Sequence, residues 1–396
     1  METVRSPLPA ARGRYPALIS LGIVGVLLAL LILGLLLLVK GGGIPGREGP
    51  LPVAVDPSQE LAMGLYDVPI EALPQAKAAG FDLVHVYDSR QELPAAMRYL
   101  AAAQSLGMEV IQNMPASHLE DGRDFWVQWV SSLAGFETVA WWYLPEEPRR
   151  EQHDAMKALY DTVHEYDPKQ RPVAVYFGTT HLEEWCDVAD IILVPAYPDY
   201  YETPQADVLA WMDTARASCP GKQVVSVQAL FDSRFDGTGA QPSARRVRNA
   251  AYAAAMNGSP AILWYSYSRG QELPGVWQAV QETVQALEAD APAIASPVSP
   301  QRVTARVQQG PSRTPKVEAF RYPSVRVLES KVGEERTIFA LSLVEEEVTV
   351  DFEGLPSYVK EVTVAADGRT LQVVAGQFQD VLEPLAVRVY RVHREP

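Results

Sequence analysis

The stretch DIILVPAYPDYYETPQADVLAWMDTARASCPGKQVVSVQALF, residues 190–231, contains the alternation that decides the fold. It begins with a run of apolar, largely β-branched residues at 190–197 and ends with a second such run at 223–231. Between the two runs, residues 204–218 place apolar side chains three and four positions apart, which is typical of one face of a helix. A strand, a helix and a second strand in this order predict a parallel β-α-β unit.

The same alternation extends over residues 61–290. Further strand-like runs bring the total to about eight, and they occupy 61–68, 81–87, 108–114, 139–144, 171–177 and 261–267. Helical patterns separate most of these runs, but only THLEEWC (180–186) is available before residue 190, where we expect a single turn. Eight strands over about 230 residues predict a (β/α)8 barrel, whereas a doubly wound sheet usually has fewer strands.

A second domain is predicted at 301–396. Residues 291–300 are rich in proline and serine, so we expect the last barrel helix to end at about 290 and a linker to follow. Beyond the linker, apolar and polar residues alternate at period two in runs such as SVRVLES (324–330), RTIFALSLV (336–344) and LAVRVYRV (385–392). This period is typical of strands with one buried face and predicts a small antiparallel β-sandwich.

The N-terminal region has the pattern of a membrane anchor. Residues 15–39 carry no charged side chain over about 25 positions, which is long enough for a transmembrane helix and too long for a cleaved signal peptide. Three arginines precede the segment, against Lys40 and Arg47 after it, so residues 1–14 are predicted to be a cytoplasmic tail. Residues 40–60 predict a flexible tether. The folded domains would then lie outside the cytoplasm, held at the cell membrane by a single-pass signal anchor.

Charge and motif content exclude several classes of function. A formal net charge of -15 argues against a nucleic-acid partner, since such surfaces are basic. No CxxC or HExxH motif occurs, and we expect no metal or cofactor. His85 and His118 with Asp67 are a possible metal set, but the first strand lacks an HxH pair, and a neutral barrel histidine is the simpler interpretation.

Active sites of (β/α)8 barrels lie at the carboxyl ends of the strands, so side chains there are the candidates. The carboxylates at these ends are Asp67, Glu146, Glu147, Asp199 and Asp232. Polar and aromatic candidates for ligand contact are His85, Asn113, Tyr176, Tyr197, Gln228, Trp264, Tyr265 and Tyr267. Aromatic rings at such positions suit sugars, whose C–H faces stack on them.

The run WWYLPEEP, residues 141–148, ends the predicted fourth strand. It resembles the fourth-strand ending of retaining (β/α)8 glycoside hydrolases, in which a Glu before Pro is the general acid/base. It is more similar still to the Y-x-x-D-E-P run of uncharacterised glycoside-hydrolase-like barrels. The resemblance implies that Glu147 is the general acid/base, with Glu146 where many of those enzymes have Asn. Because neighbouring strand residues project oppositely, we expect only one of the two carboxylates to enter the pocket.

The runs VVSVQALFD (224–232) and QPSARRVRNAAYAAAMNGSPAILWYSY (241–267) are similar to the seventh- and eighth-strand endings of such barrels. The resemblance places Gln228 near the catalytic nucleophile, normally a Glu, and makes Trp264 the substrate platform. An amide cannot act as a carboxylate nucleophile, so retaining double displacement through Gln228 is excluded. Asp232, Asp67 and Asp199 remain as candidates for the second carboxylate, including in an inverting reaction.

The sequence therefore predicts a membrane-anchored, extracytoplasmic glycoside hydrolase that acts on an oligo- or polysaccharide. Two alternatives stay open. The first is a non-catalytic carbohydrate-binding barrel, which Gln228 favours. The second is a structural or interaction role of the sandwich, with the barrel as a passive scaffold.

Cys186 and Cys219 each lie a few residues before a predicted strand, the sixth and the seventh. Those strands are neighbours in a barrel, so both cysteines would lie at its amino-end face. In an extracytoplasmic compartment such a pair predicts a structural disulfide.

Overall fold

The computed structural model describes residues 47–48, 61–87, 92–119, 122–235 and 238–392. Residues 47 and 48 form the short strand β1 (Arg47–Glu48). The predicted tail (1–14), anchor (15–39) and nearly all of the tether (40–60) lie outside these ranges. Among the helices that the structure describes, none has the length and apolar character needed to cross a bilayer.

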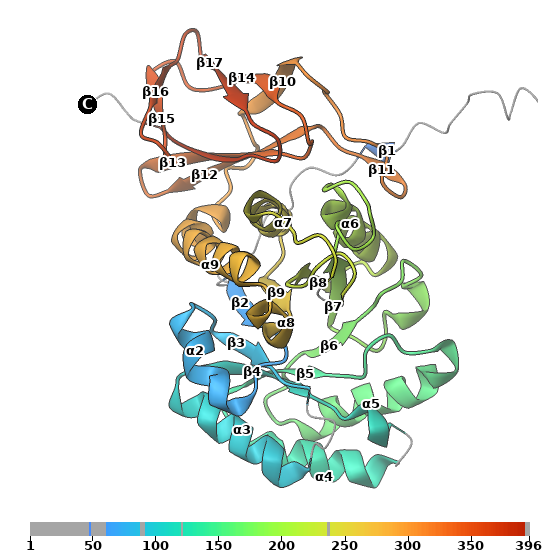
Figure 1. Ribbon diagram of the computed structural model, residues 1–396. Helices are drawn as coiled ribbons and strands as arrows, with labels where there is room; N and C mark the ends of the chain where they lie inside the picture. Colours follow the sequence, from blue (N-terminus) through green and yellow to red (C-terminus); the bar gives the residue numbers. More distant parts are fainter. Residues whose placement is uncertain (1–46, 49–60, 88–91, 120–121, 236–237, 393–396) are drawn as a thin grey trace, which may run out of the picture. The chain divides into compact units, whose positions relative to one another are not determined.

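Eight parallel strands close into a barrel in sequence order, from β2 to β9 (Figure 1). They are β2 (Ala62–Leu65), β3 (Leu83–His85), β4 (Glu109–Asn113), β5 (Val139–Tyr143), β6 (Val173–Tyr176), β7 (Ile191–Ala196), β8 (Gln223–Ala229) and β9 (Ala261–Tyr265). Each lies within one of the predicted runs. The prediction of a (β/α)8 barrel is confirmed.

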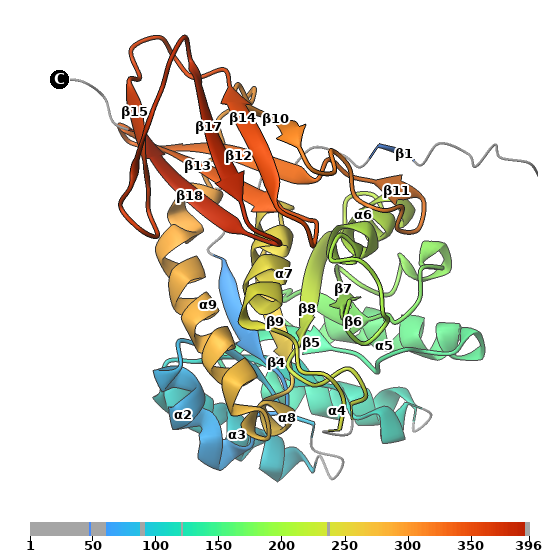
Figure 2. The same cartoon turned by 45° about the horizontal axis from the view of Figure 1, so that its top comes forward.

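Helices cover the outside of the barrel, and Figure 2 shows α7 and α9 side by side there. The α-helices are α2 (Leu73–Ala78), α3 (Leu93–Ser105), α4 (Arg123–Leu133), α5 (His153–Tyr166), α6 (Asp207–Ser218), α7 (Ala244–Met256), α8 (Tyr267–Gln271) and α9 (Pro274–Ile294). The 3-10 turns are η1 (Ile70–Ala72), η2 (Ala116–His118), η3 (Arg150–Gln152) and η4 (Glu183–Trp185). Between β6 and β7 the chain forms only η4, which confirms the predicted single turn.

Strand side chains alternate between two separate cores. On β8, Val225 and Val227 point into the barrel interior, whereas Val224 packs in the layer beneath the helices. On β9, Leu263 and Tyr265 face the interior, and Ile262 faces the helices. This alternation decides which side chains reach the carboxyl-end opening of the barrel.

The predicted linker at 291–300 is partly wrong. Helix α9 continues to Ile294, with Pro292 inside it. Pro292 removes one hydrogen bond of the helix because it has no N–H to donate, and burial of Ile294 in the core offsets that loss. The residues after the helix bond to a sheet strand, because Val298 N donates to Glu329 O at 2.8 Å.

The C-terminal residues form two antiparallel sheets, which confirms the predicted sandwich. One sheet contains β10 (Thr304–Gln309), β14 (Val348–Glu353) and β17 (Gln377–Leu382). The other contains β12 (Val325–Val332), β13 (Glu335–Ser342), β18 (Val387–Val392), β15 (Glu361–Val364) and β16 (Thr370–Gln372). Phe352 and Phe378 of the first sheet share a core with Tyr390 of the second. A two-residue strand, β11 (Phe320–Arg321), precedes β12.

The five-stranded sheet and the barrel helices share a continuous buried core. Phe339 and Leu341 of β13 belong to the same apolar cluster as Tyr252 of α7. Asn249 of α7 is fully buried, and its Nδ2 donates to Ser342 O at 2.7 Å. The five-stranded sheet is therefore packed against the barrel helices and is not joined to them by a linker alone.

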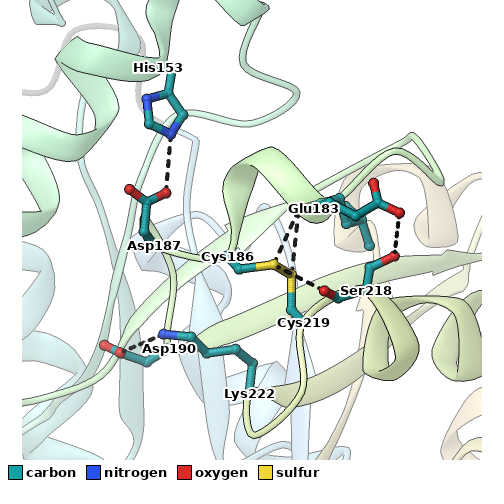
Figure 3. Close-up of a disulfide and its surroundings, with 9 residues drawn as sticks. His153, Glu183, Cys186, Asp187, Asp190, Ser218, Cys219 and Lys222 are labelled. Carbon is teal, nitrogen blue, oxygen red and sulfur yellow. Dashed lines mark hydrogen bonds and ion pairs between the residues drawn. A yellow bond between two sulfur atoms is a disulfide. The ribbon is translucent and has the colours of Figure 1, made fainter.

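Cys186 and Cys219 form a disulfide, with their Cα atoms 5.3 Å apart (Figure 3). Cys186 follows η4, and Cys219 caps the end of α6. Beside the disulfide, Ser218 Oγ donates to Glu183 Oε1 at 3.2 Å. The disulfide thus links the connection between β6 and β7, which has no full helix, to the end of α6.

Removing the disulfide should lower stability. For a loop closed by residues 33 apart in sequence, the chain-entropy model gives about 3–4 kcal/mol. We expect the double variant Cys186→Ser/Cys219→Ser to unfold at lower urea concentration, as followed by circular dichroism. A reducing agent should bring the wild type to the midpoint of the variant and leave the variant unchanged. Equal midpoints for the oxidised wild type and the variant would contradict the expectation.

Candidate active site

A pocket of about 280 Å³ opens at the carboxyl ends of the barrel strands. Its lining is mostly aromatic and otherwise acidic or aliphatic, and the described residues that form it are Tyr66, Tyr87, Glu146, Glu147, Tyr176, Tyr197, Tyr200, Tyr201, Val227, Phe231, Phe235 and Tyr265. No lysine, arginine or histidine occurs in this described lining.

The tyrosines come from strand ends and from the loops after them. Tyr176 ends β6 and Tyr265 ends β9, at positions whose side chains face the interior. Tyr66 follows β2 directly, and its ring stacks on that of Tyr87 with centroids 6.0 Å apart. Phe235 stacks on Tyr265 at 5.9 Å. Packing of ring on ring gives the pocket walls a fixed shape.

Glu146 is the inner carboxyl group of the pocket. Its Oε1 accepts hydrogen bonds from the hydroxyls of Tyr87 and Tyr143, and Tyr66 in turn donates to the Tyr143 hydroxyl at 3.1 Å. Burial raises the pKa of Glu146 above its ordinary value, and the charge of Glu147 adds to the rise, while the two tyrosine hydroxyls oppose it. The protein thus holds Glu146 in one orientation and favours its protonated form.

Glu147 lies at the mouth of the same pocket and is exposed. Its φ angle of 45° is in the left-handed region, and its backbone N donates to Tyr176 O at 3.0 Å. Its carboxyl group lies against Gly178, where a Cβ atom would overlap Oε1. The expectation that only one of the two carboxylates enters the pocket is wrong, because β5 ends at Tyr143 and strand alternation no longer holds at Glu146.

The other candidate carboxylates are engaged outside this pocket. Asp67 accepts from Ser268 Oγ at 2.7 Å and lines a separate cavity. Asp199 pairs with Arg246 at 3.0 Å. Asp232 is buried and accepts from the backbone N of Gly239 at 2.5 Å, which closes its loop. None of the three contributes to the described lining.

The structure corrects the predicted roles of Gln228 and Trp264. The two residues are paired in register on β8 and β9, on the outward face of the barrel. Trp264 is fully buried and packs edge-on against Phe81 at 5.6 Å, so it is not a substrate platform. Gln228 Nε2 donates to Ser226 Oγ at 2.9 Å, away from the pocket. The neighbouring inward residues, Val227 and Tyr265, line the pocket instead.

His85, Asn113 and Tyr267 are also outside the lining. His85 is fully buried behind it, with its ring 4.3 Å from that of Tyr87, and Asn113 ends the next strand beside it. Burial lowers the pKa of His85 to about 3, so the ring is neutral near pH 7. The hydroxyl of Tyr267 donates to Gln75 Oε1 at 2.7 Å, beneath α2. Of the predicted aromatic contacts, Tyr176, Tyr197 and Tyr265 lie in the pocket, whereas Trp264 and Tyr267 do not.

Sequence reasoning missed several aromatic residues that lie on loops. Tyr200 and Tyr201 follow β7, and Phe231 and Phe235 follow β8. The run Tyr197–Tyr201, with three tyrosines in five positions directly after a strand, was the one available signal.

A larger cavity of about 530 Å³ lies at the opposite end of the barrel. Its lining includes the first residues of five strands, namely Ala62, Leu83, Glu109, Ile191 and Gln223. Barrel enzymes carry out their chemistry at the carboxyl ends of the strands, and the paired carboxyls lie there. The tyrosine-lined pocket is therefore the candidate active site.

Comparison with known proteins shows a likeness of fold. No family model and no curated protein matches the sequence. Among solved structures, the α-amylase of Geobacillus thermoleovorans, crystallised with acarbose, has a TM-score of 0.56 and 11% identity, covering 87% of this chain and 100% of the amylase chain. A GH30 endoxylanase from Clostridium papyrosolvens has a TM-score of 0.51 and 11% identity, covering 88% and 98%.

A further structure, described only as a glycoside hydrolase, has a TM-score of 0.58 and 12% identity, covering 88% of this chain and 99% of that one. This chain therefore has the barrel-and-sheet fold of glycoside hydrolases.

The raised pKa of Glu146 makes stability depend on pH. The folded protein binds this proton more tightly than the unfolded chain does. The resulting stabilisation of the fold is complete below the ordinary pKa of 4.5 and is lost as pH rises through the pKa of the folded state. Glu146→Gln is uncharged at every pH. We expect the difference in Tm between variant and wild type to move in favour of the variant from about pH 4 to about pH 8.

Thermal unfolding at the two pH values measures this difference. Glu346→Gln, which neutralises an exposed carboxylate of the sheets, is the control and should give a constant difference. A Glu146→Gln difference that does not change with pH would mean that burial of this carboxyl has no energetic effect.

Proposed function

We propose that the protein is a glycoside hydrolase that acts on an oligo- or polysaccharide, with Glu147 as general acid/base. The observation that carries the proposal is the pairing of Glu146 and Glu147 in a tyrosine-lined pocket at the carboxyl end of the barrel. The fold shared with glycoside hydrolases supports it.

The two carboxyl groups differ in surroundings, as acid and partner groups do in hydrolysis. Glu147 is exposed at the mouth, so it can donate a proton to the leaving oxygen and then take one from water. Glu146 is fixed by two tyrosine hydroxyls deeper in the pocket. With its proton released to solvent, Glu146 would stabilise the positive charge that develops on the sugar ring. The tyrosine rings offer faces for the sugar C–H groups.

Replacing the general acid should remove turnover and spare the binding of an uncharged polysaccharide. We expect Glu147→Gln to lower kcat at least about 100-fold on a polysaccharide that the wild type cleaves, because it has no proton to transfer. The measurement is reducing-end release, with ligand affinity by calorimetry. Asp67→Asn is the matched control: it removes a carboxylate at another strand end, outside the pocket, and Asn tolerates the positive φ of 57° there. Full turnover by Glu147→Gln would remove Glu147 from the mechanism.

A second candidate function is carbohydrate binding without catalysis. It is favoured by the inner face of β8, where Val225, Val227 and Ala229 occupy the interior positions and no carboxylate stands among them. Under this alternative the wild type binds glycans and releases no product from any of them, even on long incubation. Turnover abolished by Glu147→Gln would exclude it.

We further propose that the protein is anchored in the cell membrane through residues 15–39, with the barrel and sheets outside the cytoplasm. The charge-free segment and the arginines before it support this topology. A disulfide at Cys186 and Cys219 is consistent with an oxidising compartment.

The anchor is tested by fractionation. We expect the full chain to stay in the membrane fraction after an alkaline wash, and a chain that begins at residue 47 to be soluble. Protease added outside intact spheroplasts should digest the sheet domain of the full chain. Recovery of the full chain in the soluble fraction, or protection of that domain from protease, would contradict the proposed topology.

A further inference from the structure

The described lining of the pocket contains acidic side chains and no basic ones. Glu146 and Glu147 both line it, and neither forms an ion pair with a described cationic side chain. Of the two neighbouring arginines, Arg269 contacts a ring of the pocket lining, and both are paired with carboxylates. Arg269 lies over the ring of Phe235, 4.9 Å from its centroid, and pairs with Glu272 at 4.0 Å, while Arg246 pairs with Asp199. The described lining thus contains two carboxyl groups and no cationic side chain.

The aromatic lining adds to this preference. The face of an aromatic ring is electronegative and attracts a cation placed over it, most strongly where water is partly excluded. Tyr201 and Tyr265 are partly exposed and line the pocket together with Glu147. A cation bound between these rings and Glu147 would gain from ring and carboxylate together.

The geometry points to a saccharide that carries free amino groups, a cationic hexosamine oligomer, as the ligand of this pocket. The inference deepens the proposed function and rests on it. The ammonium group would pair with Glu147 against the face of Tyr201 or Tyr265, and the C–H faces of the sugar would stack on the remaining tyrosines. An N-acetylated sugar carries no charge, so it would gain neither the ion pair nor the cation–π contact.

Three β-1,4-linked tetramers of equal length test the inference by calorimetry: glucosamine, N-acetylglucosamine and glucose. We expect the glucosamine tetramer to bind wild type at least about tenfold more tightly than either neutral tetramer. Glu147→Gln should reduce that preference to below about threefold. Glu346→Gln removes one exposed carboxylate of the sheets and should retain the full preference, which separates the pocket from general attraction to an acidic protein.

A pair of variants at Tyr201 separates the ring from the hydroxyl. Tyr201→Phe keeps the aromatic face and should retain the preference, whereas Tyr201→Leu should lose about threefold of it. Because Tyr201 is partly exposed on a loop, both variants should fold, which circular dichroism checks. Equal effects of the two substitutions would exclude the cation–π contact and overturn this part of the inference.

Other outcomes distinguish the inference from the proposed function. Equal or tighter binding of a neutral tetramer, or an equal loss in Glu147→Gln and Glu346→Gln, would overturn the inference. If a neutral glycan were also cleaved, the proposed function would stand without it. A preference for the glucosamine tetramer with no turnover of any tetramer would overturn hydrolysis and leave the pocket as a binding site for amino sugars.

Discussion

Closure of eight parallel strands into a barrel is the constraint on which the rest of the structure depends. Once the ring is closed, each strand residue faces either the interior or the helices, and no side chain can change sides without breaking the register. The interior is filled by residues such as Leu83, Ile111 and Leu193, so the chemistry is left to the loops at the carboxyl ends of the strands. At that end the chain places tyrosines and two adjacent glutamates.

The tyrosine hydroxyls do more than fill space. Tyr66 donates to Tyr143, and Tyr143 and Tyr87 both donate to Glu146, so a chain of hydrogen bonds starts in the barrel interior and ends at a carboxyl group. His85 lies among the same rings as a neutral, fully buried group. Such a network fixes Glu146 without a cationic partner among the described side chains.

Much of the fold was predictable, because eight apolar runs separated by helical patterns leave few alternatives to a barrel. The short turn at Glu183–Trp185 followed from the small number of residues between two runs. The site was less predictable. Trp264 and Tyr265 are neighbours on one strand, so their side chains point to opposite faces. A shift of one residue in strand register decides which ring lines the pocket. The family likeness did not supply this register and favoured Trp264, which faces away from the pocket. Glu146 entered the pocket because the chain turns after Tyr143, ending at a positive φ on Glu147 that no sequence pattern signals.

The connection between the barrel and the sheets affects where proteases can cleave the chain. Its first residues are helical up to Ile294, and its next ones bond to β12 through Val298 and through Ser296, whose carbonyl accepts from Lys331 N at 3.0 Å. A protease needs an extended, unbonded stretch of several residues to cleave. Between Pro274 and Val303 the chain offers no such stretch of appreciable length, so digestion would not release the sheets as a separate fragment. The folded region would then be degraded as one cooperative unit.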